Sequence, residues 1–182
     1  MTETHTGPAA GPPPEIRAAL GAHTTLTLAY GDEEGPQACA VLYAMRNRPP
    51  CGPGSPGDGT GGEEADGEIS LVFVTSTTTR HGRALASGNA PVAFTVQRDG
   101  QEWTALTGVQ GRGTCALLNG AERAAAWDAY RARFPYVERS ERLRQAMDRT
   151  EFWELRPDWL RLVDNGRGFG HRTEWRRPDA RC

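Results

Sequence analysis

The apolar residues of this chain mostly alternate with polar ones or form short unbroken runs, which is the pattern of β-strands. The clearest run is ISLVFV at residues 69–74, and a second strand-type run occupies residues 90–96 after a Gly-Asn turn. Between the two runs, a cluster of Thr and Ser residues precedes a helical pattern that starts at Arg80 and ends at Ser87. The pattern predicts a strand, a polar turn, a short helix and a second strand, in that order.

The segments before this unit predict a helix and two strands. Residues 15–23 carry one short apolar face, which favours a brief helix. Residues 25–45 predict two strands joined by the acidic turn GDEEG at residues 31–35. We therefore expect a hairpin to precede the unit described above.

A glycine-rich strand is predicted after the unit. Asp99-Gly100 indicates a tight hairpin that leads into residues 102–118. The glycines of this strand are Gly108, Gly111 and Gly113. Glycine inside a strand indicates either a bend of a barrel strand or the close approach of something flat, and the sequence leaves both readings open.

Two amphipathic helices are predicted next. Asn119 is the expected N-cap of the first, with Glu122 three residues later in a capping-box arrangement. The aromatic residues of its inner face, which we expect to pack in the core, are Trp127, Tyr130 and Phe134. Residues 140–149 predict the second helix, with Leu143 and Met147 directed inward.

The C-terminal part returns to strands. Residues 152–155 and 159–163 are predicted as two strands joined at Pro157-Asp158, and residues 168–175 form a last segment after an Asn-Gly turn. The sum is a mainly β fold: a small antiparallel barrel of six or seven strands with three short peripheral helices.

One domain is expected, because 182 residues suffice for one sizeable core. We place it at residues 15–176, between a disordered Pro/Gly-rich tail at 1–14 and a C-terminal tail at 177–182. Residues 46–68 show no periodicity and are rich in Gly and Pro. They predict a flexible insertion between two strands of one sheet.

Composition and charge exclude several classes of function. The net charge is −2 and the C-terminal arginines alternate with acidic residues, so we expect no nucleic-acid partner. The chain has no lysine, which excludes Schiff-base chemistry on a lysine. No apolar run approaches the roughly 18 residues of a membrane helix. The four cysteines lack CxxC spacing, so we expect free thiols in a soluble, cytoplasmic protein.

Hydroxyl groups and cations gather where the short helix begins, at Thr79, Arg80 and His81. A helix start presents free backbone N–H groups and a positive dipole end, for which phosphate is the natural ligand. The alternative is an ordinary helix cap beside a solvated arginine. Local chemistry leaves both readings open.

Three groups of residues carry a family resemblance through their order and spacing. They are Thr79-Arg80-His81 with Leu85, Asn89 and Pro91; Gly108-Val109-Gln110; and Phe134-Pro135 followed by Trp153-Glu154-Leu155, Asp164-Asn165 and Gly168-Phe169-Gly170. Together they resemble the FMN-binding split barrel of the pyridoxamine 5'-phosphate oxidase-like superfamily, most closely a short bacterial branch of uncharacterised, YhbP-like proteins. The resemblance covers roughly residues 15–175.

The resemblance implies an FMN-dependent oxidoreductase that acts on an unknown small molecule. The residues that it places at the FMN phosphate are Thr79, Arg80 and His81, and Gln110 falls near the flavin ring. It also implies a homodimer with cofactor sites at the interface. The residues that would serve the neighbouring subunit's flavin are Trp153, Phe169 and His171. Of these, His171 is the candidate catalytic residue, as a proton donor or substrate contact.

Departures from the family refine these expectations. Residues 39–44 contain neither of the two further cations that members with tightly bound FMN carry there, so we expect weaker binding. The oxidases' C-terminal Arg-Leu-His-Asp-Arg motif is matched only at His171, which argues against pyridoxamine phosphate as substrate. Two alternatives remain. One is a haem-binding split barrel with His81 or His171 as axial ligand, and the other is a non-catalytic member with a vestigial site.

Overall fold

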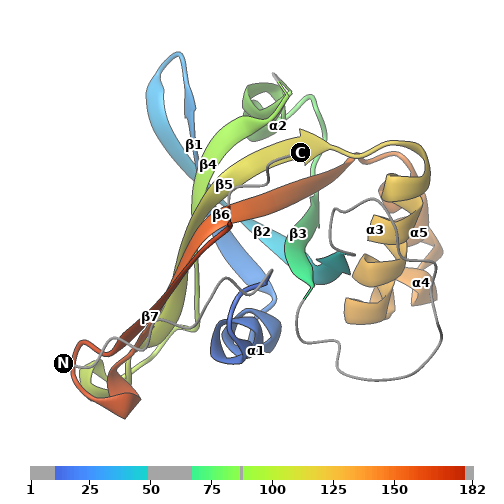
Figure 1. The fold of residues 1–182 in the computed structure, drawn as a ribbon. Coiled ribbons are helices and arrows are strands. Elements are labelled where there is room, and N and C mark those ends of the chain that lie inside the picture. Colours follow the sequence, from blue (N-terminus) through green and yellow to red (C-terminus); the bar gives the residue numbers. More distant parts are fainter. Residues whose placement is uncertain (1–10, 49–66, 87, 179–182) are drawn as a thin grey trace.

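The computed structural model describes residues 11–48, 67–86 and 88–178. Seven strands form one antiparallel sheet in the order β3–β2–β1–β4–β5–β6–β7, and β3 also pairs with β6. The strands are β1 (Thr25–Asp32), β2 (Gly35–Arg48), β3 (Glu68–Val74), β4 (Ala90–Gln97), β5 (Thr107–Leu117), β6 (Phe152–Asp164) and β7 (Arg172–Arg176). The pairing of β3 with β6 closes the first six strands into a barrel, from which β7 is excluded (Figure 1). The predicted antiparallel split barrel is thus confirmed.

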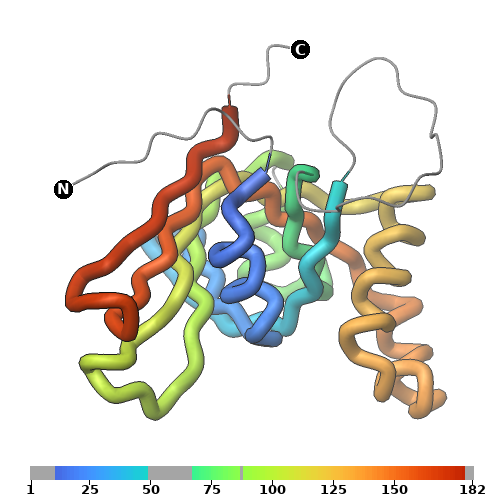
Figure 2. The backbone as a smooth tube through the Cα atoms, turned by 60° about the horizontal axis from the view of Figure 1, so that its bottom comes forward, coloured from blue at the N-terminus to red at the C-terminus, as the bar shows by residue number. Residues whose placement is uncertain are grey.

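Helices lie around this barrel, and the described residues contain more of them than the three predicted. They are α1 (Pro14–Ala22), α2 (Arg80–Leu85), α3 (Gly120–Arg133), α4 (Tyr136–Arg139) and α5 (Glu141–Asp148), with short 3-10 turns η1 (Trp103–Ala105) and η2 (Asn165–Arg167). Figure 2 shows α3–α5 grouped on one side of the sheet and α1 away from them. None of the helices in the described part of the chain is both long and apolar enough to span a membrane.

Two hydrophobic clusters stabilise the fold. The larger fills the barrel and includes Phe73, Phe94 and Trp153. The smaller lies between the outer side of the sheet and α3–α4, and includes Val72 and Phe152 with the predicted aromatic stripe. Val72 and Phe73 are neighbours on β3 and enter different clusters, because successive strand residues point to opposite faces. Burial on both faces is the reason that residues 69–74 are apolar apart from Ser70.

The split in the barrel arises where β6 changes its partner. Residues 152–155 pair with β3, whereas residues 159–163 pair with β7. Pro157 lies at the change and has no N–H to donate to either neighbour. Opposite it, the register of β5 shifts between Arg112 and Gly113. Beyond this point β4–β7 continue as an arm that projects from the barrel (Figure 1). β6 is one continuous strand, so the prediction of two strands joined at Pro157 was wrong.

The glycines of β5 serve packing within the sheet. A Cβ added to Gly113 would overlap the carbonyl oxygen of Arg156, and one added to Gly111 would overlap the ring of Phe94. The space beside both residues is therefore filled by the chain itself. Of the two readings left open by the sequence, the bent and closely packed barrel strand is confirmed at these positions.

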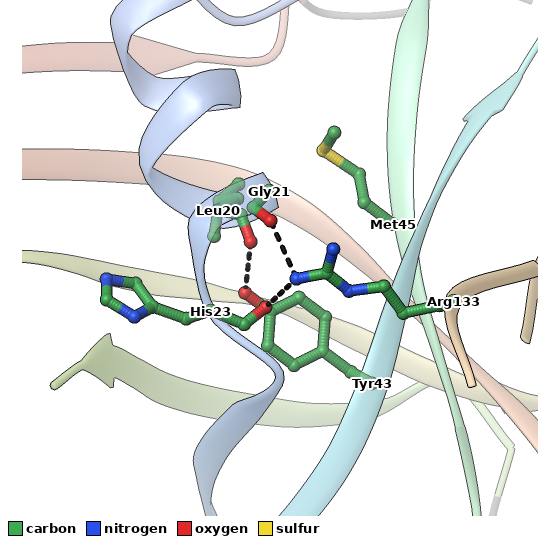
Figure 3. Close-up of a pocket in the computed structure, with 6 residues that line it drawn as sticks. All are labelled: Leu20, Gly21, His23, Tyr43, Met45 and Arg133. Atoms are coloured by element: carbon green, nitrogen blue, oxygen red, sulfur yellow. Dashed lines mark hydrogen bonds between the residues drawn. The ribbon is translucent and has the colours of Figure 1, made fainter. Parts of the chain in front are cut away.

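Helix α1 is tied to the barrel through its C-terminal carbonyl groups. The hydroxyl of Tyr43 donates to the carbonyl of Leu20 at 2.5 Å, and Arg133 donates to the carbonyls of Gly21 (2.7 Å) and His23 (3.1 Å), as Figure 3 shows. These carbonyls lie where a helix has no intrahelical donors left. Burial raises the pKa of Tyr43, which keeps the hydroxyl protonated and able to donate. The polar groups named here, which line a small cavity, thus already bind one another and stabilise the fold.

Several local predictions need correction. The connection after β4 is no tight Asp99-Gly100 hairpin, since it runs over residues 98–106 and contains η1. Asn119 is the N-cap of α3 but its side chain makes no capping hydrogen bond, and Glu122 pairs with Arg46. Leu143 on α5 is exposed, whereas Met147 packs against the smaller cluster.

The predicted insertion has narrower limits than expected. Residues 46–48 belong to β2 and residue 68 to β3, and these two strands are paired neighbours in the sheet. Residues 49–66 of the insertion, most of the N-terminal tail and the end of the C-terminal tail lie outside the described residues. Among the described cysteines, Cys39 and Cys115 are free thiols, as predicted.

Candidate functional site

The candidate site lies where β3 ends and α2 begins, and we call Thr75, Thr79, Arg80 and His81 together the α2 corner. Thr79 is the N-cap of α2, and its hydroxyl accepts from the N–H of Gly82 at 3.0 Å. The tight turn depends on Gly82, where a Cβ would overlap the carbonyl oxygen of Ser76. The predicted order of strand, polar turn, helix and strand is confirmed, with α2 only six residues long.

Thr75 connects the hydroxyl groups of the corner to its histidine. It is 7% exposed, and its hydroxyl lies 3.1 Å from that of Thr79 and 2.5 Å from Nε2 of His81. Burial lowers the pKa of His81, which favours the neutral imidazole. The ring of Tyr30 on β1 packs at a tilt against it, with centroids 6.3 Å apart. His81 is thus held by a hydrogen bond in surroundings that favour its neutral form.

Arg80 is engaged by two carboxylates from the β1–β2 hairpin. Its Nε donates to Oδ2 of Asp32 at 2.6 Å, and its Nη2 donates to Oδ1 of Asp32 at 3.2 Å and to Oε2 of Glu34 at 2.8 Å. The hydrogen bond from Arg80 lowers the pKa of Asp32, and the same contact raises the pKa of Arg80. We call Asp32 and Glu34 the hairpin carboxylates.

The other predicted site residues lie elsewhere. Gln110 on β5 is exposed and pairs across the sheet with Thr95 and Arg161. Trp153 is fully buried, and its indole N–H donates to the carbonyl of Thr75 at 3.0 Å. The resemblance implied a contact of Trp153 with a neighbouring subunit's flavin, and the fully buried side chain offers no surface for it in this subunit. Instead, Trp153 supports the α2 corner from within.

Phe169 and His171 lie at the end of the arm. Phe169 is 77% exposed and makes an edge contact with Trp103, with ring centroids 5.4 Å apart. The side chain of Asn165 donates to the carbonyl of Trp103 at 2.8 Å, which joins the two loops of the arm. Nε2 of His171 is buried and has no hydrogen-bond partner. Figure 1 places the end of the arm and α2 at opposite ends of the subunit. A single chain does not bring His171 to Arg80.

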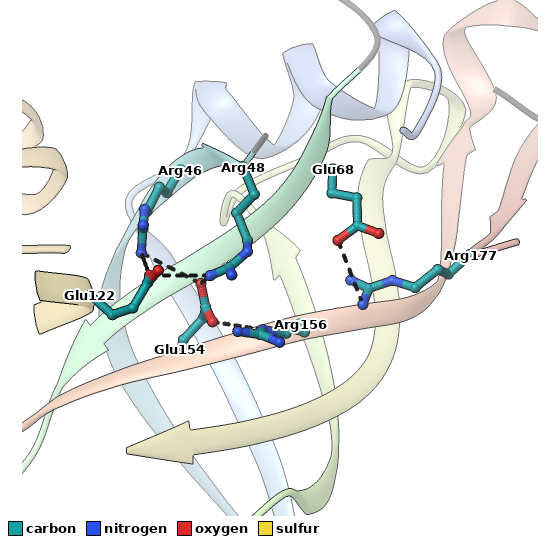
Figure 4. Close-up of polar contacts among 7 residues, drawn as sticks. All are labelled: Arg46, Arg48, Glu68, Glu122, Glu154, Arg156 and Arg177. Atoms are coloured by element: carbon teal, nitrogen blue, oxygen red, sulfur yellow. Dashed lines mark hydrogen bonds and ion pairs between the residues drawn. The ribbon is translucent and has the colours of Figure 1, made fainter. Parts of the chain in front are cut away.

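Two arginines of β2 form a second, separate network with carboxylates. Arg48 lies 2.6 Å from Oε1 of Glu154, and Arg156 donates to its Oε2 at 2.7 Å. Arg46 pairs with Glu122 of α3 at 2.7 Å (Figure 4). Burial acts to raise the pKa of Glu154, but the hydrogen bonds from the arginines outweigh it and the pKa is lowered. The cations that β2 possesses lie beyond residues 39–44 and serve this network.

The sequence analysis missed the hairpin carboxylates and Thr75. The turn at residues 31–35 was recognised as a hairpin, but no local signal indicates that it reaches Arg80 some 46 to 48 positions later. Thr75 belongs to the recognised Thr and Ser cluster. Only the structure, in which β3 pairs with β6, shows that Thr75 is the buried residue of this cluster.

Comparison with known proteins gives relatives in sequence and in fold, although no family model matches the chain. The UPF0306 protein YhbP of Salmonella schwarzengrund is 36% identical over 114 residues, which span 63% of this chain and 71% of the relative. This similarity reaches most of the relative's length.

Solved structures share the fold at low sequence identity. A haem-binding protein from Mycobacterium smegmatis is similar with a TM-score of 0.54 and 24% identity, over 94% of this chain and 59% of that one. A protein from Clostridium acetobutylicum related to general stress protein 26, of the pyridoxinephosphate oxidase family, is similar with a TM-score of 0.54 and 14% identity. That match covers 89% of this chain and 92% of the other. These similarities show the split-barrel fold.

Proposed function

The chain belongs to the UPF0306 family of YhbP-like proteins, and from that premise we propose that it is an FMN-binding oxidoreductase of the pyridoxamine 5'-phosphate oxidase-like type. Its substrate is a small molecule. The observation that carries the proposal is the α2 corner, where Arg80 follows the capping residue Thr79 at the start of α2 and hydrogen bonds join Thr75 to Thr79 and His81.

The residues of the corner fit a phosphate in part. Arg80 supplies a planar pair of N–H donors, which is the geometry that binds phosphate oxygens in pairs. The hydroxyl of Thr79 donates to the carbonyl of Ser76 at 2.8 Å, and that of Thr75 lies against Thr79 and His81, so these hydroxyls would donate to a phosphate only by giving up those hydrogen bonds. The hairpin carboxylates oppose an anion at the same place, and residues 39–44 add no cation. The fit therefore supports a phosphate that is held weakly.

When bound, FMN would supply two-electron redox chemistry, and the protein supplies position and electrostatics. Arg80 and the two threonines would hold the phosphate. Gln110 stays the proposed contact near the ring, on the outer surface of β5. His171 would hold or donate a proton at Nε2, the atom that lacks a partner in the isolated subunit.

A homodimer completes the proposed site. Phe169 and His171 lie on the arm, far from the α2 corner of their own subunit, so they reach a flavin only in a neighbouring one (Figure 1). The exposed rings of Trp103 and Phe169 give the arm an apolar end suited to burial against another copy. Sedimentation equilibrium tests this: a dimer supports it, and a monomer in the presence of FMN contradicts it.

Titration of the purified apoprotein with FMN tests the function. Quenching of flavin fluorescence should report saturable binding in the micromolar range, and Arg80→Ala should weaken it by about tenfold or more because a charge-assisted pair is lost. Arg142→Ala is the matched control, because it removes an exposed arginine from α5 and leaves the corner intact. Absence of FMN binding by the wild type would refute the oxidoreductase. Equal affinity of Arg80→Ala and wild type would refute the phosphate assignment.

A haem-binding protein is the second candidate. It is favoured by the buried, unpartnered Nε2 of His171 and by the fold shared with the Mycobacterium smegmatis protein. A histidine nitrogen is an axial ligand of haem iron. The visible spectrum after incubation with each cofactor separates the candidates, since haem bound through His171 would give a Soret band that His171→Ala removes. No retained cofactor of either kind supports a vestigial site.

A further inference from the structure

The hairpin carboxylates occupy the same donors of Arg80 that a phosphate would need. Asp32 bonds Nε and Nη2 with both of its oxygens, at 2.6 and 3.2 Å, and Glu34 takes a second bond from Nη2 at 2.8 Å. A carboxylate and a phosphate bind a guanidinium in the same paired, planar way. The two ligands therefore compete for one set of N–H groups.

The charges of the three side chains also oppose an anion. One guanidinium faces two carboxylates, so the group carries a net charge of −1 at neutral pH. The lowered pKa of Asp32 keeps this carboxylate ionised well into the acid range. A phosphate that approaches Arg80 meets repulsion until the hairpin moves away.

The hairpin is built to hold its carboxylates in place. The turn closes at Gly35, whose φ of +106° is a backbone conformation that favours glycine. Within the turn, the N–H of Glu34 donates to Oδ1 of Asp32 at 2.9 Å. Asp32 is mostly buried, with a side chain 17% exposed, whereas the side chain of Glu34 is 77% exposed. Asp32 is thus the more buried partner of Arg80 and Glu34 the exposed one.

We infer that Asp32 and Glu34 act as a tethered competitor for Arg80, so that a phosphate-bearing ligand binds the α2 corner only by displacing the tip of the β1–β2 hairpin. This inference rests on the proposed function and adds a control of affinity to it. The hairpin lowers the affinity of any ligand that binds through its phosphate and leaves the affinity of a ligand without phosphate unchanged.

Charge-neutral variants of the hairpin test the competition. Asp32→Asn keeps an oxygen that accepts from the N–H of Glu34, so the turn is preserved while the charge is removed. Exposed ion pairs are weak, so Asp32→Asn should tighten FMN binding by about threefold to tenfold, and Glu34→Gln by about twofold. The double variant Asp32→Asn/Glu34→Gln should exceed either single one. Riboflavin, which has no phosphate, should bind all variants with the affinity of the wild type.

Glu33→Gln is the matched control. Glu33 lies in the same turn and its removal changes the net charge equally, but no contact links it to Arg80 in the described structure. It should tighten FMN binding by less than twofold. An equal gain in all three single variants would show a general effect of charge and would overturn the competition.

The outcomes separate the inference from the function. If the wild type binds FMN through Arg80 and Asp32→Asn matches Glu33→Gln, the function stands and the competition falls. If no variant binds FMN, including the double variant, both fall. If the variants bind riboflavin more tightly by the same factor as FMN, the hairpin blocks the flavin ring and does not compete for Arg80. The inference then also fails. Selective tightening of FMN supports both.

Discussion

The molecule contains two arginine–carboxylate networks of similar chemistry and different surroundings. In one, Arg80 meets the hairpin carboxylates at the surface, and its side chain is 43% exposed. In the other, Arg48 and Arg156 hold Glu154, whose side chain is completely buried (Figure 4). Water reaches Arg80 and Glu34 in the first network, whereas in the second the carboxylate of Glu154 is closed to water even though Arg156 is 42% exposed. The same pairing is exchangeable in one place and structural in the other.

This difference explains why β2 adds no phosphate ligand. Arg46 and Arg48 lie on that strand but neutralise Glu154 and Glu122, and so they hold α3 against the barrel. A buried carboxylate without these cations would be costly. Arg46 and Arg48, whose side chains are each 14% exposed, are therefore less available to a ligand than Arg80 at 43%.

The largest expected effect is the loss of the buried carboxylate. Glu154→Gln should lower the free energy of unfolding by about 3 kcal/mol, because it removes the buried carboxylate shared by three arginines and leaves only the half-exposed Glu122 to face Arg46 and Arg48. Urea unfolding at pH 7 measures this. Glu141→Gln, which removes an exposed ion pair on α5, serves as the control and should leave the unfolding midpoint nearly unchanged. Wild-type stability of Glu154→Gln would contradict the structural role.

The stability of the protein should fall in acid, and Glu154 should account for part of the fall. Its pKa is lowered by folding, so its contribution is complete above the unfolded pKa of about 4.3 and is lost as pH decreases through the folded value. Urea midpoints at pH 7, 5, 4 and 3 should therefore decline less steeply for Glu154→Gln than for the wild type. Parallel declines would mean that other carboxylates determine the acid sensitivity.

Glu122→Gln should destabilise the protein less than Glu154→Gln. Its side chain is 48% exposed, and Arg46 retains Glu154 at 3.7 Å as a second partner. Solvent therefore compensates for much of the lost pair. The measurement is the same urea series, and a larger effect for Glu122 than for Glu154 would reverse the comparison between exposed and buried partners.

Arg80→Ala should have the smallest effect on stability, with an unfolding midpoint close to that of the wild type. Its ion pairs lie at the surface, where such pairs contribute little. The same substitution should have a large effect on FMN affinity. Thermal or urea unfolding, run beside the flavin titration, shows whether the two properties separate as expected. A marked loss of stability would show that the ion pairs of Arg80 stabilise the fold, as those of Glu154 do.

The sequence predicted the order of elements around α2 because each has a strong local signal. Residues 69–74 are apolar on both strand faces, and Thr79 caps the helix that follows. Predictions failed where a distant partner overrides the local pattern. Glu122 pairs with Arg46 of β2, and β6 continues through Pro157 opposite a register shift in β5. Trp153 was assigned to a cofactor because sequence alone does not show burial.

The sequence by itself determined the strands, the turns and the candidate anion corner, since periodicity, glycine turns and capping residues act within a few positions. The tertiary structure alone decided which charges meet. Asp32 and Arg80 are separated by 48 positions and Arg48 and Glu154 by 106, yet both pairs are in contact. Electrostatic attraction depends on distance in space and on exposure to water, and both follow only from the closed sheet.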